Sequence, residues 1–330
     1  MTRQETALVL GATGGIGGEV TRTLKARGWR IRALHRKRGA AGNPGDGLDW
    51  MKGDAMNAGD VVAAAHGVSL VVHAVNPPGY RDWGKLVLPM LDSSIVAAKA
   101  SGARILFPGT VYNFGPDAWP ILREDSPQHP KTRKGAIRVE MERRLKAAAA
   151  EGVRSLIVRA GDFFGPRGTS NSWLGAGLVK PGQTPTSVAY PGRKGVGHQW
   201  AYLPDVAETM VRLIESEDRL AAFEVFHMDG HWDPDGTAMV GAVGRACRKP
   251  DMKATAFPWW AIILASPFVT TFRELLEMRY LWREPLRMDN RRLVAFLGQE
   301  PHTPLDDAVK ASLIGLGCLP ETGGGGAAPA

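Results

Sequence analysis

ALVLGATGGIG, residues 7–17, is the stretch of sequence that decides the fold. Its apolar first part, Ala7 to Leu10, predicts a β-strand that runs directly into glycines at positions 11, 14 and 17, behind which a helix opens. In such a unit the first glycine permits a tight turn, the second lets backbone amides approach a pyrophosphate, and the third allows close packing of helix on sheet. The helix N-terminus faces the phosphate charge. The stretch therefore predicts a Rossmann-type unit that binds a nicotinamide dinucleotide.

Short β-branched runs alternate with helical patterns through the first half of the chain. This alternation is typical of a parallel sheet with helices on both faces. Six strands are predicted, at Ala7–Leu10, Arg30–His35, Leu48–Lys52, Leu70–His73, Arg104–Phe107 and Ser155–Arg159. Helices are predicted near residues 15–28, 86–101 and 135–151. We therefore expect an α/β fold with a doubly wound parallel sheet, and residues 1–165 as mainly the dinucleotide-binding domain.

The second half of the chain is expected to form a smaller substrate-binding lobe, mainly residues 166–318 and partly interleaved with the core. After Gly165-Pro166 the composition shifts to Gly, Pro, Ser and Thr, which is typical of loops over a pocket. Regular patterns return with a helix that Asp205 would cap, a strand at Glu224–Met228, and helices near 236–248, 270–282, 289–297 and 305–316. The tail, residues 319–330, is expected to be disordered, and its LPETG sequence is interpreted as chance or an appended tag.

The composition predicts a soluble globular protein of the reducing cytoplasm. Hydrophobic residues make up 44% and charged residues 22% of the 330 residues, which argues against disorder. Cys247 and Cys318 lie far apart, so we expect neither a disulfide framework nor a metal site. The most apolar stretch, Phe257 to Phe272, contains two prolines and is expected in the core or along a pocket rather than on a membrane. The net charge of +8 comes without a nucleic-acid motif, so the expected partner is a small molecule; a homodimer is left open.

Further motifs follow the predicted strands. Gly53-Asp54 follows the third strand, His73-Ala74 the fourth, Gly109-Thr110 the fifth and Phe163-Phe164-Gly165-Pro166 the sixth. With the glycine turn and the run from Gln199 to Ala207, they make the chain resemble the short-chain dehydrogenase/reductase superfamily, in its extended or atypical branch with NAD-dependent epimerase/dehydratase-like members. The resemblance implies a substrate contact from Asn76 and cofactor contacts from Gly11, Thr13, Gly14, Gly15, Ile16, Gly17, Asp54, His73 and Ala74. Asp54 would lie on the adenine side; a turn or cap role is its alternative.

The residues after the second strand bear on the choice of dinucleotide. An acidic residue there would accept the ribose hydroxyls of NAD, whereas a basic residue would accommodate the extra phosphate of NADP. The sequence is His35-Arg36-Lys37-Arg38, and no carboxylate appears until Asp46. We therefore expect NADP, with Arg36 as the main contact and NAD as the alternative. A solvated basic loop would have the same sequence.

The catalytic groups that the resemblance implies are only partly present. They are a Ser or Thr that orients the substrate oxygen, a Tyr that transfers a proton, and a Lys four residues later that lowers the pKa of the phenol. Thr110 stands at the hydroxyl position, and Tyr112 would share its face on a continuing strand. In the matching helix, Lys134 stands where the Tyr should be and Arg138 where the Lys should be.

Two functional hypotheses follow for Lys134 and Arg138. In the first, Lys134 transfers the proton, because the like charge of Arg138 on the same helix face and partial burial would lower the pKa of the lysine. Glu142, four residues further on, would oppose this by neutralising Arg138. In the second, both residues bind cofactor ribose or phosphate, and Tyr112 or a water donates the proton. A solvated basic run is the structural alternative.

The remaining polar residues give weaker signals. His198 and Trp200 lie in the predicted substrate region and are candidate substrate contacts, although core packing would explain them equally. The Tyr-x-x-x-Lys spacing from Tyr190 to Lys194 contains a proline and a glycine, so we expect no helix there.

Taken together, these features predict an NAD(P)-dependent oxidoreductase or epimerase with an atypical active site. Its substrate would be a small molecule with a carbonyl or hydroxyl group, and a nucleotide sugar is one such class. The missing Tyr–Lys pair favours an alternative from another class, a catalytically idle NADP-binding sensor or scaffold protein. The retained Thr110 and the elaborate second lobe favour the enzyme.

Overall fold

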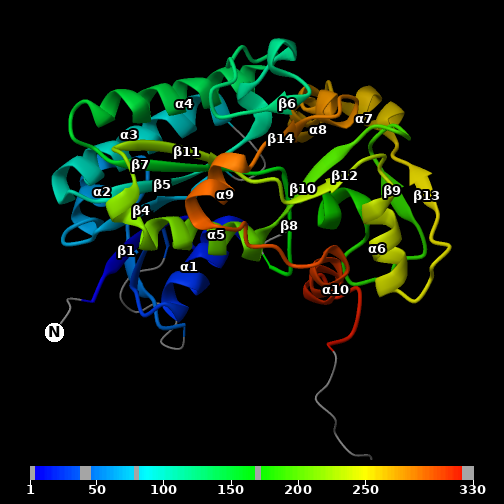
Figure 1. The fold of residues 1–330 in the computed structure, drawn as a ribbon, viewed down its shortest axis with the longest axis horizontal. Coiled ribbons are helices and arrows are strands. Elements are labelled where there is room, and N and C mark those ends of the chain that lie inside the picture. The colour runs from blue at the N-terminus through cyan, green and yellow to red at the C-terminus, as the bar shows by residue number, and fades with distance from the viewer. Residues whose placement is uncertain (1–3, 38–45, 78–81, 168–171, 322–330) are drawn as a thin grey trace, which may run out of the picture.

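A parallel sheet of seven strands forms the centre of the N-terminal part of the molecule (Figure 1). The computed structural model describes residues 4–37, 46–77, 82–167 and 172–321. The strand order is β11-β7-β5-β4-β1-β2-β3, and every neighbouring pair is parallel. The strands are β1 Thr6–Leu10, β2 Arg30–His35, β3 Asp49–Lys52, β4 Leu70–His73, β5 Arg104–Gly109, β7 Ser155–Arg159 and β11 Phe223–His227. The predicted fold class is confirmed, and the strand expected near residue 224 joins this same sheet beside β7.

The direction in which strands are added reverses between β1 and β4. From β1 the chain steps to β2 and β3 on one side, and it then crosses to β4, β5 and β7 on the other side. The connections that leave the carboxyl ends of β1 and β4 therefore diverge and leave a crevice between them. Open α/β sheets bind their ligands at this kind of crevice.

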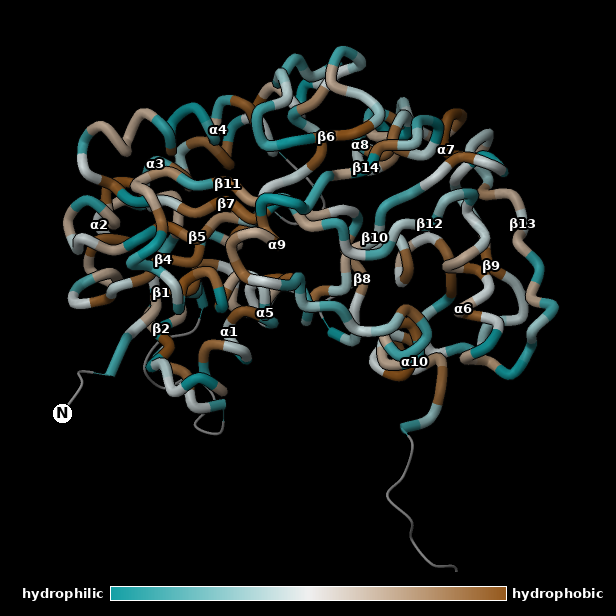
Figure 2. The backbone as a smooth tube through the Cα atoms, in the orientation of Figure 1, coloured by the Kyte–Doolittle hydropathy of each residue, from teal (hydrophilic) through white to brown (hydrophobic). Residues whose placement is uncertain are grey.

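Alternating side chains of the strands supply an apolar core on each face of the sheet. Ala7 and Val9 of β1 belong to one core, whereas Leu8 and Leu10 belong to the opposite one. Helices α1 Gly15–Ala26, α5 Leu203–Glu215 and α9 Arg291–Leu297 pack on the first face, and α2 Ala58–Ala64, α3 Trp83–Ser101 and α4 Arg133–Ala149 pack on the second. Figure 2 shows the hydrophobic strands between these helices.

A smaller lobe lies beside the sheet (Figure 1). Its strands are β8 Asp162–Phe164, β10 His198–Tyr202 and β12 His231–Asp233 in one sheet, with the pairs β9 Val188–Tyr190 and β13 Ala254–Ala256, and β6 Ile121–Leu122 and β14 Arg287–Met288. Its helices are α6 Ala238–Ala246, α7 Trp259–Ala265, α8 Thr270–Glu277 and α10 Leu305–Gly315. Trp200, Trp282 and Leu313 are buried in its core. Because β11, α5 and α9 return to the first part, the two parts are interleaved along the chain.

Several element boundaries differ from the sequence prediction. Helix α2 was not predicted; it begins after Asn57, whose side chain accepts hydrogen bonds from the amides of Gly59 and Asp60. Asp205 is not the N-cap of α5, because that helix begins at Leu203 and the Asp205 carboxylate instead accepts two hydrogen bonds from Thr303. No helix within the described ranges is both long and apolar enough to cross a lipid bilayer.

The apolar stretch from Phe257 to Phe272 does not line the large cleft described below. Trp259 and Ile262 of α7 are buried in the core of the second lobe, as expected, but Leu264 and Phe268 are 72% and 89% exposed. Part of the stretch therefore lies in the core and part at the surface. Because the stretch is apolar almost throughout, its composition could not predict which residues are exposed.

Candidate cofactor and substrate cleft

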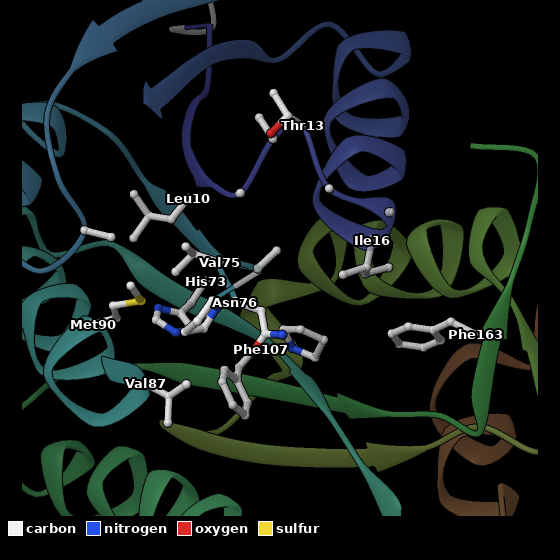
Figure 3. A pocket seen from close by; sticks show the side chains of 18 of the residues that line it. Leu10, Thr13, Ile16, His73, Val75, Asn76, Val87, Met90, Phe107 and Phe163 are labelled. Carbon is white, nitrogen blue, oxygen red and sulfur yellow. The ribbon is translucent and has the colours of Figure 1, made fainter. Parts of the chain in front are cut away.

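A cleft of about 700 Å³ opens where the strand order reverses. Figure 3 shows side chains of the glycine turn and of the later strand ends, among them Thr13, His73 and Phe107, around one space. Residues at or just after the carboxyl ends of five strands line the cleft: Gly11 to Ile16 at β1, His35 to Lys37 at β2, Gly53 and Asp54 at β3, His73 to Pro77 at β4, and Phe107 to Tyr112 at β5. Later segments add Arg138, Met141, Ala160 to Phe163, Ser172, Trp173 and Leu203. The sheet thus brings most of the predicted site residues to one cavity.

The glycine turn has no room for side chains at two of its positions. Gly11 has a φ of +94°, and a Cβ there would lie 2.5 Å from the carbonyl oxygen of Ala74. A Cβ on Gly17 would lie 2.2 Å from the carbonyl oxygen of Gly11, so Gly17 packs against the turn and does not itself line the cleft. Helix α1 starts after Gly14 without a side-chain cap. Its first amides are therefore available to an anion such as a pyrophosphate.

The far end of the cleft, at β2 and β3, carries the residues predicted to meet the adenosine part of a cofactor. Arg36 and Lys37 line it, and Arg38 lies outside the described residues. Asp54 also lines it, and its carboxylate accepts a hydrogen bond of 3.0 Å from the amide of Met56. Asp54 therefore has both the position expected of a cofactor contact and the turn role that was its alternative.

The other end of the cleft contains Thr110, Tyr112 and Arg138. Thr110 precedes a short 3₁₀ turn, so its hydroxyl accepts a long hydrogen bond of 3.4 Å from the amide of Tyr112. The Arg138 guanidinium lies 5.3 Å from the ring centre of Phe107 and donates a hydrogen bond of 3.3 Å to the carbonyl of Pro108. A fixed positive charge therefore lies beside the end of β5.

His73 is the last residue of β4, Asn76 lies three residues further on, and both line the cleft. The His73 ring is buried, and its Nδ1 lies 2.8 Å from the hydroxyl of Ser94. Burial, with a smaller effect from the charge of Arg138, lowers the pKa of His73 to about 3, so the ring is neutral at pH 7. Asn76 accepts a hydrogen bond from the indole of Trp83 at 2.5 Å, which fixes its amide at the cleft wall.

A buried polar network behind Thr110 was not foreseen from the sequence. Arg159 at the end of β7 is fully buried and forms an ion pair of 2.8 Å with Glu142 of α4. Its guanidinium also donates to the backbone carbonyl of Thr110 and, at 3.1 Å, to His227. Glu142, which was expected to neutralise Arg138, thus pairs with Arg159. The spacing of Arg138 and Glu142 predicts that they share one face of the helix. It does not predict that Glu142 pairs with Arg159 of β7.

Lys134 lies outside the lining of this cleft, contrary to expectation. It is 3% exposed, and its Nζ lies 2.8 Å from a carboxylate oxygen of Glu274 in α8. It lines a separate cavity of about 480 Å³ together with Lys85, Arg133 and Arg273. The physical reason is its place in the first turn of α4, where an acidic partner from α8 packs against it. An ion pair with Glu274, which the sequence prediction did not include, therefore belongs to the surroundings of this lysine.

His198 and Trp200 are buried in the second lobe and do not line the cleft, so core packing describes their positions. Asp162, which the sequence prediction overlooked, does line it, and its carboxylate lies 2.9 Å from Nε2 of His198. Tyr190 ends strand β9, which confirms that the Tyr190–Lys194 spacing does not lie on a helix.

Comparison with families of known proteins gives one match that covers most of the chain. The model of the NAD dependent epimerase/dehydratase family matches residues 7–228. The protein y4nL of Sinorhizobium fredii, itself uncharacterized, is 28% identical over 212 residues, which are 58% of this chain. This chain spans 60% of the length of that relative.

Solved structures share the fold at low sequence identity. A putative epimerase from Burkholderia cenocepacia superposes with a TM-score of 0.72 at 17% identity, covering 96% of this chain and 99% of that one. MoeE5 in complex with UDP-glucose and NAD gives 0.70 at 18% identity, with 94% and 98% covered. The UDP-glucose 4-epimerase of Thermotoga maritima, solved with UDP-glucose, gives 0.70 at 14% identity, with 93% and 97% covered.

Proposed function

Because the chain belongs to the NAD-dependent epimerase/dehydratase family, we propose that it is an enzyme that binds a nicotinamide dinucleotide in the cleft and oxidises or reduces a small substrate. The substrate carries a carbonyl or hydroxyl group. One observation carries the proposal: a single cavity joins the glycine turn to Thr110 and Arg138. The dinucleotide, when bound, supplies hydride transfer at its nicotinamide ring.

The residues of the cleft have distinct parts in this proposal. The amides at the start of α1 bind the pyrophosphate, and the close packing at Gly11 and Gly17 keeps the turn near it. The Thr110 hydroxyl donates a hydrogen bond to the substrate oxygen. Arg138 binds ribose hydroxyls, because a guanidinium remains protonated and is a poor proton donor for catalysis. Tyr112 or a water is the proton source in the simplest version.

A nucleotide sugar is the substrate class that we propose. Support comes from the structural neighbours MoeE5 and the Thermotoga maritima epimerase, both solved with UDP-glucose. Trp173 and Ser172 line the cleft on the side of the second lobe, where an aromatic face and a hydroxyl suit a base or sugar ring.

The test is to purify the protein, identify any co-purifying dinucleotide by mass, and assay aldehydes, ketones and nucleotide sugars. Net oxidation or reduction changes the absorbance at 340 nm. Epimerisation causes no net change, so nucleotide sugars are also followed by NMR for a change of configuration. Turnover of any member of the panel is the expected result. Tight dinucleotide binding without turnover across the panel would contradict the proposal.

We further propose that the preferred cofactor is NADP, because Arg36 and Lys37 line the end of the cleft at β2. Arg36→Ala is expected to weaken NADPH binding at least tenfold and to leave NADH binding almost unchanged, since only NADPH carries the extra phosphate. Titration by fluorescence measures both constants. Arg30→Ala, at the opposite end of β2, is the matched control. Tighter binding of NADH than of NADPH by the unmodified protein would reject the assignment.

A second candidate function is an idle NADP-binding sensor or scaffold. It is favoured by the position of Lys134, which is paired with Glu274 away from the cleft and leaves the usual proton-donor position without a cleft group. Binding of NADPH together with a change in oligomeric state or partner binding, and without turnover, would support this function.

A further inference from the structure

Asp162 and His198 form a hydrogen-bonded pair at the wall of the cleft. Asp162 begins β8 and His198 begins β10, and these strands are parallel neighbours in which Trp200 stands opposite Asp162. Nε2 of His198 lies 2.9 Å from Oδ2 of Asp162. The Asp162 side chain is 17% exposed and lines the cleft, whereas that of His198 is 6% exposed and does not. The pair thus joins a buried imidazole to a carboxyl group that reaches the cavity.

The hydrogen bonds of His198 determine how many protons the pair holds. Nδ1 lies 3.3 Å from the carbonyl oxygen of Leu281, which can only accept, so this nitrogen has an acceptor when it is protonated. Nε2 faces a carboxylate oxygen, and that contact also requires a hydrogen between the two atoms. When both ring nitrogens are protonated, each has an acceptor, and the pair then holds one transferable proton, between Nε2 and Oδ2, in addition to the proton on Nδ1.

The aromatic surroundings hold this ring in place and keep water from it. The imidazole stacks on Trp282 with a centroid distance of 3.8 Å and an interplanar angle of 6°, and Trp200 meets it edge-on at 4.8 Å. Asp162 therefore connects the ring to the cavity. The titratable groups near this region include Tyr280 and Tyr190. Burial raises the pKa of both phenols; the charges of Asp162 and Glu277 add to the effect at Tyr280, and those of Asp233, Asp235 and, least, Asp162 add to it at Tyr190. Both hydroxyls are consequently neutral at pH 7.

We infer that Asp162 delivers a proton to, and removes it from, the substrate oxygen in the cleft, with His198 as the positioning residue that stores that proton. This inference rests on the proposed function and puts Asp162 in place of Tyr112 or a water as the proton source. In the reducing direction, with hydride supplied by a bound dinucleotide, the carbonyl carbon would gain a C–H bond and the carbonyl oxygen would take the shared proton from the pair. The proton leaves the pair, so Asp162 ends as a carboxylate and His198 as the neutral ring protonated on Nδ1. The two electrons that reduce the substrate would come with that hydride. The reverse direction returns the proton to the pair.

The activity arm of the test uses Asp162→Asn, which keeps the size of the side chain but cannot carry the proton. With the active substrate of the panel, kcat is expected to fall at least 100-fold while the Kd for NADPH changes less than threefold. His198→Gln is expected to lower kcat less than Asp162→Asn does. It is also expected to shift the limb of the pH profile of kcat/KM that reports the proton-donating group. His302→Gln, an exposed histidine of the same lobe, is the control. An unchanged kcat in Asp162→Asn would overturn the inference while the proposed function stands.

The second arm needs no substrate, so it remains decisive if no turnover is found. The imidazole nitrogens of His198 are followed by ¹⁵N NMR in the whole protein at pH 7. Two protonated or proton-sharing nitrogens are expected in the unmodified protein, and one in Asp162→Asn, where the amide can donate to Nε2. A neutral ring with only one protonated nitrogen, whichever nitrogen that is, in the unmodified protein would overturn the inference directly.

Discussion

A Cβ on Gly17 would lie 2.2 Å from the carbonyl oxygen of Gly11, closer than any van der Waals contact allows. Gly17→Ala must therefore displace the turn that we propose binds the pyrophosphate, and we expect at least a tenfold loss of NADPH affinity together with a lower Tm. Titration and thermal unfolding measure the two effects.

The matched control is Gly241→Ala in α6, where the nearest atoms belong to the flexible end of Arg245. Alanine there is expected to stabilise the helix by up to about 1 kcal/mol and to leave NADPH binding unchanged. Equal NADPH affinity in Gly17→Ala and the unmodified protein would show that the turn is not the binding element.

Two buried histidines make the stability depend on pH. Burial lowers the pKa of His73 and of His227 to about 3, and the charges of Arg138 and Arg159 act in the same direction. An unfolded histidine titrates near pH 6.5, so between about pH 3 and 6.5 the unfolded chain binds more protons than the folded one. Stability is therefore full above that window and falls as the pH is lowered through it.

At pH 5 each of these histidines is expected to reduce the free energy of unfolding by about 2 kcal/mol relative to pH 7. Urea unfolding at the two pH values measures the loss. His227→Gln should show a smaller loss between pH 7 and pH 5 than the unmodified protein, whatever its stability at pH 7. The exposed His66→Gln should show the same loss as the unmodified protein, and a loss in His227→Gln equal to that of the unmodified protein would contradict the prediction.

At the scale of elements, the uncharged helix α7 has one face in the core and another face at the surface. Ile262 is buried and Leu264 is 72% exposed, although they lie two residues apart. Ile262→Ala is expected to lower the free energy of unfolding by about 2–4 kcal/mol, and Leu264→Ala by less than about 0.5 kcal/mol. Chemical denaturation measures both. Equal losses would mean that another molecule covers the outer face of α7 or that the helix has a different rotation.

The sequence predicted those elements whose determinants are contiguous. The strand, the glycines and the helix of residues 7–26 adjoin one another, so the turn could be assigned together with its ligand class. The short helix α2 was missed because its single turn of apolar residues resembles a loop, and only the cap at Asn57 marks its start.

The parts of the site that escaped prediction depend on contacts between distant segments. Lys134 and Arg138 were correctly expected on one helix, but Glu274 of α8 determines where the lysine lies. The pairing of Asp162 with His198 requires β8 and β10 to align, which no local spacing encodes. Periodicity specifies which face a side chain occupies, and the tertiary fold then decides what it meets there.

At the scale of the molecule, segments from beyond residue 165 complete the part of the fold that contains the seven-stranded sheet. Strand β11 pairs with β7, and α5 packs on the same face of the sheet as α1. A fragment of residues 1–165 would leave β7 as an open, apolar edge. We expect that fragment to aggregate or to unfold without a cooperative transition, as measured by circular dichroism and light scattering.

A fragment of residues 1–321 is the control for this truncation and should unfold at the same Tm as the whole chain. A soluble, cooperatively folded fragment of residues 1–165 that binds NADPH would contradict the expectation.

The late position of β11 also has a consequence for the newly made chain on the ribosome. The glycine turn and β7 are synthesised well before β11, and the segment between β7 and β11 takes several seconds to make at about 5–20 residues per second. During that interval β7 lacks one of its neighbouring strands, so the nascent chain exposes an unpaired apolar strand edge to which a chaperone can bind. Rare codons within residues 166–222 would lengthen the interval and should lower the yield of soluble protein without changing a single amino acid.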